Sequence, residues 1–326
     1  MAEKTLRKPL QLLIDRNLFM KKNKILFSLL VISQNLFAGG FDDLGNSARV
    51  VSMGGANIAL ADAPYSIFYN PSGINKITNL SLSTTYSNLY PGITDDNLNY
   101  FSLSAVVPWE IIGEFGVGGT FLNSKLWKEN TFIFSYAREV YDGIALGGSL
   151  KLLRWSAEAA PGESALSYFG FTFDAGAHYT FSNLIDNSDL RVGVSILNIT
   201  QPSTAQNESE DAKLPMSIGA GLAYISNMHN YIIALDVVRF DASTKIKAGA
   251  EFLGLRHEVF GLNTAFLVRI GYDGILGSDD FSQRGINGGF GLNINDLKID
   301  YAYVYPLVLQ NVGGSHKISL NYNFNF

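Results

Sequence analysis

Few residues in this chain have the types and spacing that catalysis requires, which are a nucleophile, a base and an orienting group in contact. Cysteine is absent, which excludes disulfides, thiolate zinc sites and cysteine nucleophiles. The four histidines lie far apart and lack the HExxH spacing of zinc proteases. His178 would share a strand face with Asp174, but a histidine that is only hydrogen-bonded in the interior is the better interpretation. We therefore expect no enzyme activity, no metal and no cofactor.

Composition limits the class of protein. Charged residues make up 16% of the chain, below the roughly 25% of a typical soluble domain, while aromatic residues make up 13%. The mean hydropathy of +0.12 is too low for a bundle of membrane helices. Residues 1–38 hold seven Lys and Arg and two Asp and Glu residues, so their removal takes the net charge from −5 to −10. That acidity excludes nucleic acid as a partner, because binding phosphate needs a basic surface.

The N-terminal leader, residues 1–38, carries an export signal. A basic stretch from Met20 to Lys24 precedes an apolar run from Ile25 to Ala38. The run is shorter than the ~20 apolar residues that a membrane-spanning helix needs. We predict a secretory signal peptide at about residues 20–38 and interpret residues 1–19 as a start assigned too far upstream. A short buried helix is the alternative.

Cleavage close to Ala38 is the first testable expectation, because a basic region followed by a short apolar run is the substrate of signal peptidase. Mass spectrometry of the exported protein should find an N-terminus near Gly39. A full-length product in the cytoplasm would contradict the assignment.

Beyond residue 76, large apolar residues recur with a period of two, which indicates strands with one apolar and one polar face. We count about fourteen such segments between Ile77 and Phe326, most near the 9–11 residues of a tilted transmembrane strand. Polar stretches such as Pro202–Lys213 and Leu276–Arg284 suit extracellular loops, and Asn295-Asp296 suits a periplasmic turn. One of the clearest segments has Phe169, Phe171, Phe173, Ala175, Ala177, Tyr179 and Phe181 on one face.

The apolar face could contact lipid or a second sheet. A secreted sandwich or propeller also alternates, but no repeat of propeller-blade length is visible. The sequence favours lipid because aromatic residues gather at strand ends, as in an interfacial girdle. These residues are Trp109, Trp127, Trp155, Tyr272 and Tyr305. The predicted fold is therefore an all-β, transmembrane antiparallel barrel of about 14 strands, over residues 77–326.

The polar face of these strands would line the lumen. Charged residues of both signs recur on it, and we expect them to form a salt-bridge network around a plug. The predicted lumen-facing residues are Asp174, His178, Asp236, Lys245, Lys247, Glu251, Arg269 and Asp300.

Residues 39–76 are expected to form that plug, or hatch. The stretch is rich in Gly and Ala, which allows close packing inside a lumen. Asn70-Pro71 fixes a turn, and Gly73 is available for a positive φ. Together with Gly54 and Gly55, these residues are the predicted gating positions. The alternative is that the stretch is a first strand and its turn.

Three elements in this stretch resemble the N-terminal signature of the PorV/PorQ family, within the FadL/TodX-like group of outer-membrane proteins. They are Gly45–Ala56, with Arg49 and Met-Gly-Gly-Ala, then Ala59–Ala63, with Ala-Leu-Ala-Asp, and Phe68–Gly73. Ser72 stands where the family usually has alanine. The resemblance implies a monomeric fourteen-stranded barrel with an N-terminal hatch in the lumen. It further implies a role either in type IX secretion or in diffusion of hydrophobic compounds.

The last strand resembles the recognition strand by which the barrel-assembly machinery reads outer-membrane proteins. Tyr322, Phe324 and Phe326 alternate with asparagines up to the final residue. We therefore expect outer-membrane lipids and the assembly machinery as partners.

The leading hypothesis from sequence is a bacterial outer-membrane barrel of the PorV/PorQ type, acting in transport or type IX protein secretion with secretion components as partners. The first alternative is a FadL-like channel for hydrophobic small molecules. The second is an outer-membrane enzyme. An apolar pocket behind the hatch would favour the channel, a sealed lumen would favour docking, and a buried Ser–His contact would favour the enzyme.

Overall fold

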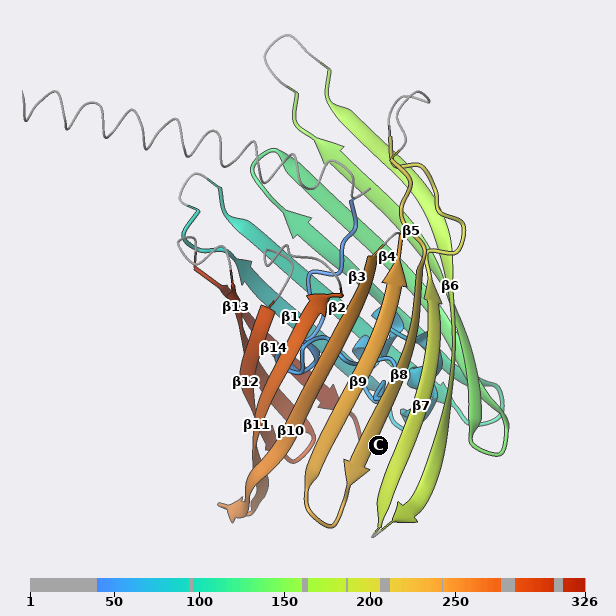
Figure 1. The fold of residues 1–326 in the computed structure, drawn as a ribbon, viewed down its shortest axis with the longest axis vertical. Coiled ribbons are helices and arrows are strands. Elements are labelled where there is room, and N and C mark those ends of the chain that lie inside the picture. The colour runs from blue at the N-terminus through green and yellow to red at the C-terminus, as the bar shows by residue number, and fades with distance from the viewer. Residues whose placement is uncertain are drawn as a thin grey trace, which may run out of the picture.

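Fourteen antiparallel strands form one closed barrel in the computed structural model (Figure 1). The first strand pairs with the last, and every other pairing joins strands that are neighbours in the sequence. Closure leaves no unpaired sheet edge, which a wall in contact with lipid requires. The prediction of an all-β barrel with about fourteen strands is thereby confirmed. The structure describes residues 40–93, 96–159, 164–185, 187–205, 212–241, 243–276, 285–307 and 313–325, so the leader lies outside the described residues.

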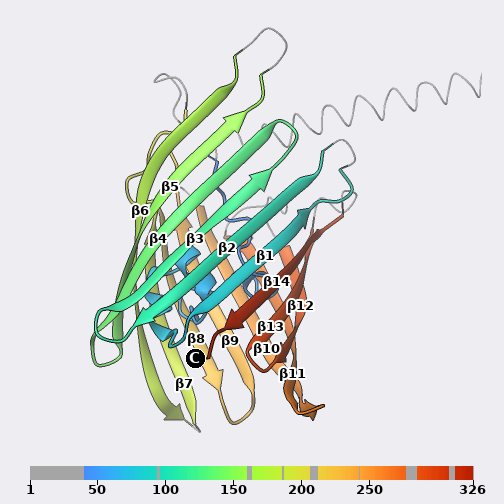
Figure 2. The same cartoon turned by 180° about the vertical axis from the view of Figure 1, so that it is seen from behind.

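The strands differ in length, and β5 and β6 rise beyond the rest of the wall at the upper end of Figure 2. The bounds are β1 Ser81–Leu89, β2 Leu98–Trp109, β3 Gly113–Asn123, β4 Trp127–Tyr141, β5 Ile144–Ala157, β6 Leu166–Ile185, β7 Ser188–Leu197, β8 Ser217–Ser226, β9 Tyr231–Phe240, β10 Ser243–Val259, β11 Leu262–Ile275, β12 Gly285–Ile294, β13 Leu297–Pro306 and β14 Ser315–Asn323.

The two ends of the barrel have different connections. Turns of two residues join β4 to β5, β10 to β11 and β12 to β13 at one end, where β1 also begins and β14 ends. Longer links, such as 198–216 between β7 and β8, lie at the other end. In outer-membrane barrels the short turns face the periplasm and the longer loops face outward. We orient the barrel accordingly.

Burial alternates along the strands as the sequence predicts. On β6, the side chains of Phe171 and Phe173 are exposed, while Thr172 and Asp174 between them are buried. The same alternation marks β14, where Ile318, Leu320 and Tyr322 are exposed and the residues between them face inward. The exposed apolar face is therefore the outer surface of the barrel, which contacts lipid.

Two of the five expected girdle residues face inward, which corrects the prediction. Trp155 is 5% exposed and its Nε1 donates to Thr204 O (3.0 Å). Trp127 stacks on it, with the ring centroids 4.6 Å apart. Alternate residues of β5, including Leu153 and Trp155, face the lumen, so the Trp155 ring lies on the lumen side of the wall. A position near a strand end does not decide which face a residue occupies.

The N-terminal segment, residues 40–77, lies inside the barrel and is drawn in blue in both ribbon views (Figures 1 and 2). It contains α2 (Ala48–Ser52), η1 (Pro64–Phe68) and η2 (Pro71–Lys76). None of the described helices has the length and apolarity to cross a membrane. A core forms between this segment and the wall, where Ile67 and Ile74 pack with Val106 and Ile133.

Ile318 offers a test of which face of the wall meets lipid. It lies on the outer face of β14, opposite Tyr301 and Tyr86. Replacing Ile318 by Arg should lower the free energy of unfolding by about 2–4 kcal/mol, the cost of a charge near the bilayer midplane. Ile111→Arg, in the exposed turn between β2 and β3, should cost about 0–1 kcal/mol. Urea unfolding in lipid vesicles measures both, and equal losses would contradict the assignment of the outer face.

Candidate functional site

The N-terminal segment crosses the lumen from one end to the other. Phe41 N donates to Glu129 Oε2 (2.8 Å) near the start of β4, at the end with the longer links. In the middle of the lumen, Ala48 N donates to Ser319 Oγ (2.6 Å) of β14. The segment then continues into β1 at the periplasmic end. It therefore occupies the path that a solute through the barrel would take.

Glycines of the wall let the backbone of this segment touch the backbone of the strands. A Cβ atom on Gly271 of β11 would lie 2.0 Å from Gly54 N. One on Gly249 of β10 would lie 2.3 Å from Met53 O. Real Cβ atoms do not approach other atoms this closely, so no larger side chain fits at either position without displacing the segment.

The same contact recurs on other strands of the wall. A Cβ atom on Gly193 of β7 would lie 2.5 Å from Ile58 O, and one on Gly147 of β5 would lie 2.4 Å from Ser72 N. The segment is thus held against strands on several sides of the barrel. We call the four positions Gly147, Gly193, Gly249 and Gly271 the glycine belt.

Polar side chains satisfy the segment's backbone groups, which have no strand ladder to pair with. Asp236 of β9 is buried and accepts from both Asn57 N (2.7 Å) and Ile58 N (2.9 Å). Asn70 Nδ2 donates to Ile58 O (2.7 Å), and Asn70 Oδ1 accepts from Ser72 N (3.2 Å). These bonds fix the non-helical turns of the segment in the lumen.

The predicted gating residues take three kinds of position. Gly54 and Gly55 have positive φ angles of 68° and 80°, a conformation that favours glycine. Pro71 begins η2 directly after the Asn70 turn. Gly73 does not have a positive φ, contrary to expectation. It is needed for space instead, since a Cβ there would lie 2.3 Å from Ala61 Cβ.

Six charged side chains form one ion-pair cluster between the segment and the wall. Arg49 Nε lies 2.8 Å from Glu251 Oε2, and Arg49 Nη1 lies 2.7 Å from Asp62 Oδ1. Arg269 Nε lies 2.6 Å from Glu251 Oε2, and Arg269 Nη1 lies 2.8 Å from Asp300 Oδ1. Glu251 therefore joins an arginine of the segment to an arginine of the wall. With Arg191, which lies 3.8 Å from Asp62, three arginines and three carboxylates share one network.

The charge of Asp62 is maintained despite its position in the lumen. Burial by itself would raise the pKa of this carboxyl, but Arg49 and Arg191 outweigh burial and lower the pKa below its usual value. Arg191 Nη1 lies 3.8 Å from Asp62 Oδ2 and also donates to Leu60 O (2.9 Å). A strand residue of the wall thereby holds the Ala-Leu-Ala-Asp element of the segment.

The two lysines predicted to face the lumen are half-buried and lie apart from this cluster. Lys247 Nζ lies 3.6 Å from Asp43 Oδ2 of the segment. Lys245 Nζ lies 5.3 Å from the centroid of the Phe240 ring. Their contacts are looser than those of the buried arginines, so they add less to the hold on the segment.

Asp174 and His178 are both buried, but the structure does not pair them. Asp174 Oδ2 lies 2.7 Å from Lys151 Nζ, whereas His178 Nδ1 lies 3.1 Å from Ser72 Oγ. The Ser72 hydroxyl also donates to Asn70 Oδ1 (2.7 Å). Ser72 is fully buried, and His178 Nε2 has no partner among the described residues. The contact between His178 and Ser72 holds the N-terminal segment against β6.

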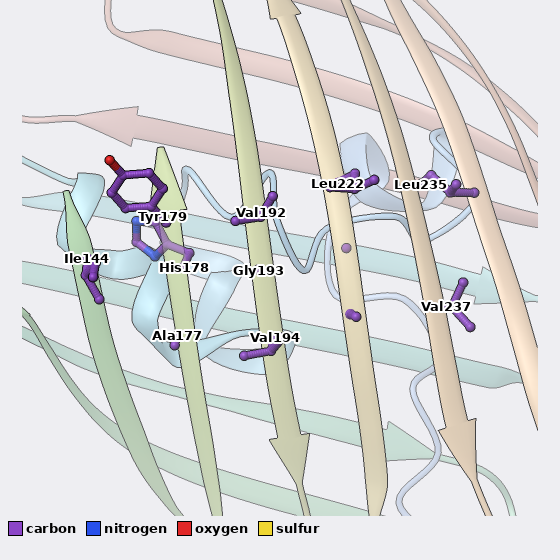
Figure 3. Close-up of a pocket in the computed structure, with 12 residues that line it drawn as sticks. Ile144, Ala177, His178, Tyr179, Val192, Gly193, Val194, Leu222, Leu235 and Val237 are labelled. Atoms are coloured by element: carbon purple, nitrogen blue, oxygen red, sulfur yellow. The ribbon is translucent and has the colours of Figure 1, made fainter. Parts of the chain in front are cut away.

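An apolar depression of about 600 Å³ lies on the outer face of the wall, across β5 to β9 (Figure 3). Tyr179, Val194 and Leu222 are among the side chains that line it. Gly193 also lines it, and the inner side of this residue touches Ile58 O. At Gly193, which has no side chain, only the strand backbone separates the lipid from the N-terminal segment.

Gly271 lets the close packing of segment and wall be tested. Replacing Gly271 by Ala should lower the free energy of unfolding by about 1–3 kcal/mol, the usual cost of overpacking a well-packed site. Gly288→Ala, on the adjacent strand, is the matched control, because its Cβ would have no neighbour closer than 3.9 Å. Urea titration of the two variants in vesicles gives the difference. Equal free energies of unfolding for the two variants would show that the segment moves away from Gly271 at little cost, and would contradict close packing.

Sequence reasoning missed the partners that the segment supplies to the wall. Arg49 and Asp62 stood within the recognised N-terminal elements, yet they were assigned no role. Their opposite signs, matched to the charges predicted for the lumen, were the signal that could have identified them. Within the described residues, no cluster of His, Asp or Glu that could hold a metal ion is found.

The end of the chain is partly described. Tyr322 is exposed on the outer face of β14, and Phe324 follows the strand with its ring 4.7 Å from that of Tyr322. Phe326 lies outside the described residues.

Several solved barrels share this fold. The toluene transporter TbuX of Ralstonia pickettii is 12% identical, with a TM-score of 0.59 over 88% of this chain and 100% of that one. The CymD monoaromatic hydrocarbon channel is 13% identical, with a TM-score of 0.59 over the same shares. A Pseudomonas aeruginosa FadL homologue is 11% identical, with a TM-score of 0.54 over 86% of this chain and 98% of that one. At these identities the likeness concerns the fold.

The sequence itself matches a secretion family. The family described as type IX secretion system membrane protein PorP/SprF matches residues 65–322, which is most of the barrel. No curated protein matches the chain. The match confirms the expected link to type IX secretion and the outer-membrane location, but not the PorV/PorQ assignment that the N-terminal motif indicated. This chain is a bacterial outer-membrane β-barrel that belongs to the type IX secretion system PorP/SprF membrane protein family.

Proposed function

We propose that this protein serves type IX secretion as a docking component of the outer membrane, and that its own lumen stays closed while it does so. The observation that carries the proposal is the backbone contact at the glycine belt, Gly147, Gly193, Gly249 and Gly271. A segment held this closely on several sides, and fixed by a buried ion-pair cluster, leaves no passage for a polypeptide beside it.

The surfaces left for partners are the two ends of the barrel. At the outer end, β5 and β6 extend beyond the other strands and are joined by a longer link. At the periplasmic end, short turns surround the mouth of the lumen. Loops positioned by a rigid barrel are the usual place for binding functions. Components of the secretion system are the partners that the family supports.

A channel for hydrophobic small molecules is the second candidate, because the solved barrels with this fold include toluene transporters. The apolar depression on the outer wall is the feature that favours it. However, the contact between Gly193 and Ile58 closes its floor towards the lumen. Passage would need the N-terminal segment to move away from the wall at that point.

Catalysis has less support than either role. The buried contact between Ser72 and His178 is the kind of pair that an enzyme would need, but the Ser72 hydroxyl also donates to Asn70. Ser72 is also out of reach of any substrate, since it is fully buried. We infer a protein without catalytic activity.

A strain that lacks this chain separates the two leading roles. Under our proposal, the strain loses type IX cargo from the medium and cell surface, and its uptake of toluene from the medium is unchanged. Expression of the wild-type chain restores secretion. Normal secretion combined with slower toluene uptake would support the channel and refute docking.

A further inference from the structure

A polar pocket of about 200 Å³ lies between the N-terminal segment and strands β10 to β14. Its lining includes Asn293 at the end of β12, Lys298 at the start of β13 and Asn323 at the end of β14. These residues adjoin the two-residue turn at 295–296, so the pocket lies at the periplasmic end of the barrel.

The charges around this pocket do not balance. Each of its acids, Asp62, Glu251 and Asp300, has an arginine partner within the ion-pair cluster. Lys76 and Lys298 also line the pocket, and neither is in ion-pair contact with a carboxylate of the described residues, while Lys298 is near enough to Asp62 to help lower the pKa of that carboxyl. Lys76 Nζ donates to Thr180 Oγ1 (2.9 Å), whereas Lys298 makes no hydrogen bond within the described part of the chain. The lining therefore carries four cationic side chains and three carboxylates, a surplus of one positive charge in a protein that is acidic overall.

Independent evidence for a ligand comes from Asn321, which is 6% exposed and lines the same pocket. Its Nδ2 donates to Asp300 Oδ2 (3.1 Å), but its Oδ1 has no partner among the described residues. A buried acceptor without a partner is costly, which makes it a good position for a donor from a ligand.

Lys298 and the Oδ1 atom of Asn321, which has no partner among the described residues, belong to neighbouring strands. Lys298 pairs directly with Asn321 on one side and with Asn293 on the other. All three face inward, and cross-strand neighbours have Cβ atoms about 4.5–5.5 Å apart. A group that contacts both Lys298 and Asn321 must therefore present an anion and an N–H donor a few bonds apart.

We propose that this pocket binds a carboxylate next to an amide N–H, the pair of groups that the last residue of a peptide presents, from the periplasmic side. Lys298 Nζ pairs with the carboxylate, and Asn321 Oδ1 accepts from the amide N–H. The volume of about 200 Å³ suits a single residue more than a folded partner. This binding goes beyond the docking role and does not depend on it, because it concerns a site in the isolated barrel.

Calorimetric titration of the full protein in lipid nanodiscs tests the site with three matched probes. N-acetylglycine carries both groups, N-acetylglycinamide lacks the charge, and acetoxyacetate has an ester oxygen in place of the N–H. We expect N-acetylglycine to bind more tightly than both of the others. Lys298→Gln should weaken its binding about tenfold, the usual value of one charged hydrogen bond. Lys125→Gln, in the exposed link between β3 and β4, should leave it unchanged.

Folding of each variant is checked by heat-modifiable migration, so that a loss of binding is not confused with a loss of the barrel. An N-acetylated tetrapeptide with a free terminal carboxylate distinguishes the sources: equal binding indicates a peptide chain, and binding of N-acetylglycine alone indicates a small acylamino acid. Absence of N-acetylglycine binding, equal binding of N-acetylglycinamide, or an unchanged affinity in the folded Lys298→Gln protein would each overturn the proposal.

Discussion

Deletion of residues 45–73 should turn a closed barrel into an open one. Wild-type protein in planar bilayers is expected to show no stepwise conductance, because the N-terminal segment fills the lumen between Phe41 and β1. The deleted protein should show channel openings, since the remaining strands close on one another without the segment. It should also be less stable, because the buried carboxylate of Asp236 loses its two backbone donors.

Heat-modifiable migration shows whether the deleted protein still folds and inserts. A variant that does not fold would mean that the segment is an integral part of the barrel and not a separable plug. A folded, inserted variant that remains as silent as the wild type would contradict the account that this segment is what closes the lumen.

Arg269→Met should be among the most destabilising single substitutions in the wall. The guanidinium group is 2% exposed and joins Glu251 to Asp300 at 2.6 Å and 2.8 Å. Its removal leaves buried carboxylates with fewer partners, and breaking a buried ion pair in this way typically costs about 3–5 kcal/mol. Arg239→Met is the control, since Arg239 is exposed and bonds only to Thr244 within the described residues.

Urea unfolding in vesicles should show the large loss for Arg269→Met and a change within about 0.5 kcal/mol for Arg239→Met. If both variants unfold at the same urea concentration as the wild type, the cluster does not hold the segment and the wall together.

The barrel could be predicted from the sequence because its signal is local. Along β6 and β14 each large apolar residue lies two positions from the next, and a one-residue error would place the whole set on the wrong face. The turn at 295–296 and the polar link at 202–213 likewise carried their own local signals. Strand number and the inner and outer faces followed from such patterns.

The contacts that hold the N-terminal segment against the wall could not be predicted, because they join residues far apart in the chain. Gly271 must lack a side chain because the backbone of Gly54, more than two hundred positions away in the chain, packs against it. Trp155 shows the same limit on a smaller scale. Its position suggested a lipid girdle, but its partners are Trp127 and the carbonyl of Thr204. Composition indicates that small or aromatic residues are present, whereas only the fold decides what they touch.

The measurement that tests the central claim most directly is type IX secretion by a strain in which the N-terminal segment of this protein is bonded covalently to the barrel wall. The chain has no cysteine, so cysteines introduced in place of Ser72 and His178, whose side chains lie 3.1 Å apart, can be joined by oxidation to a disulfide. Mass spectrometry verifies the bridge, and the two single-cysteine variants are controls. Our account predicts wild-type levels of secreted type IX cargo with the bridge in place. Secretion that stops on bridging and returns on reduction would contradict it.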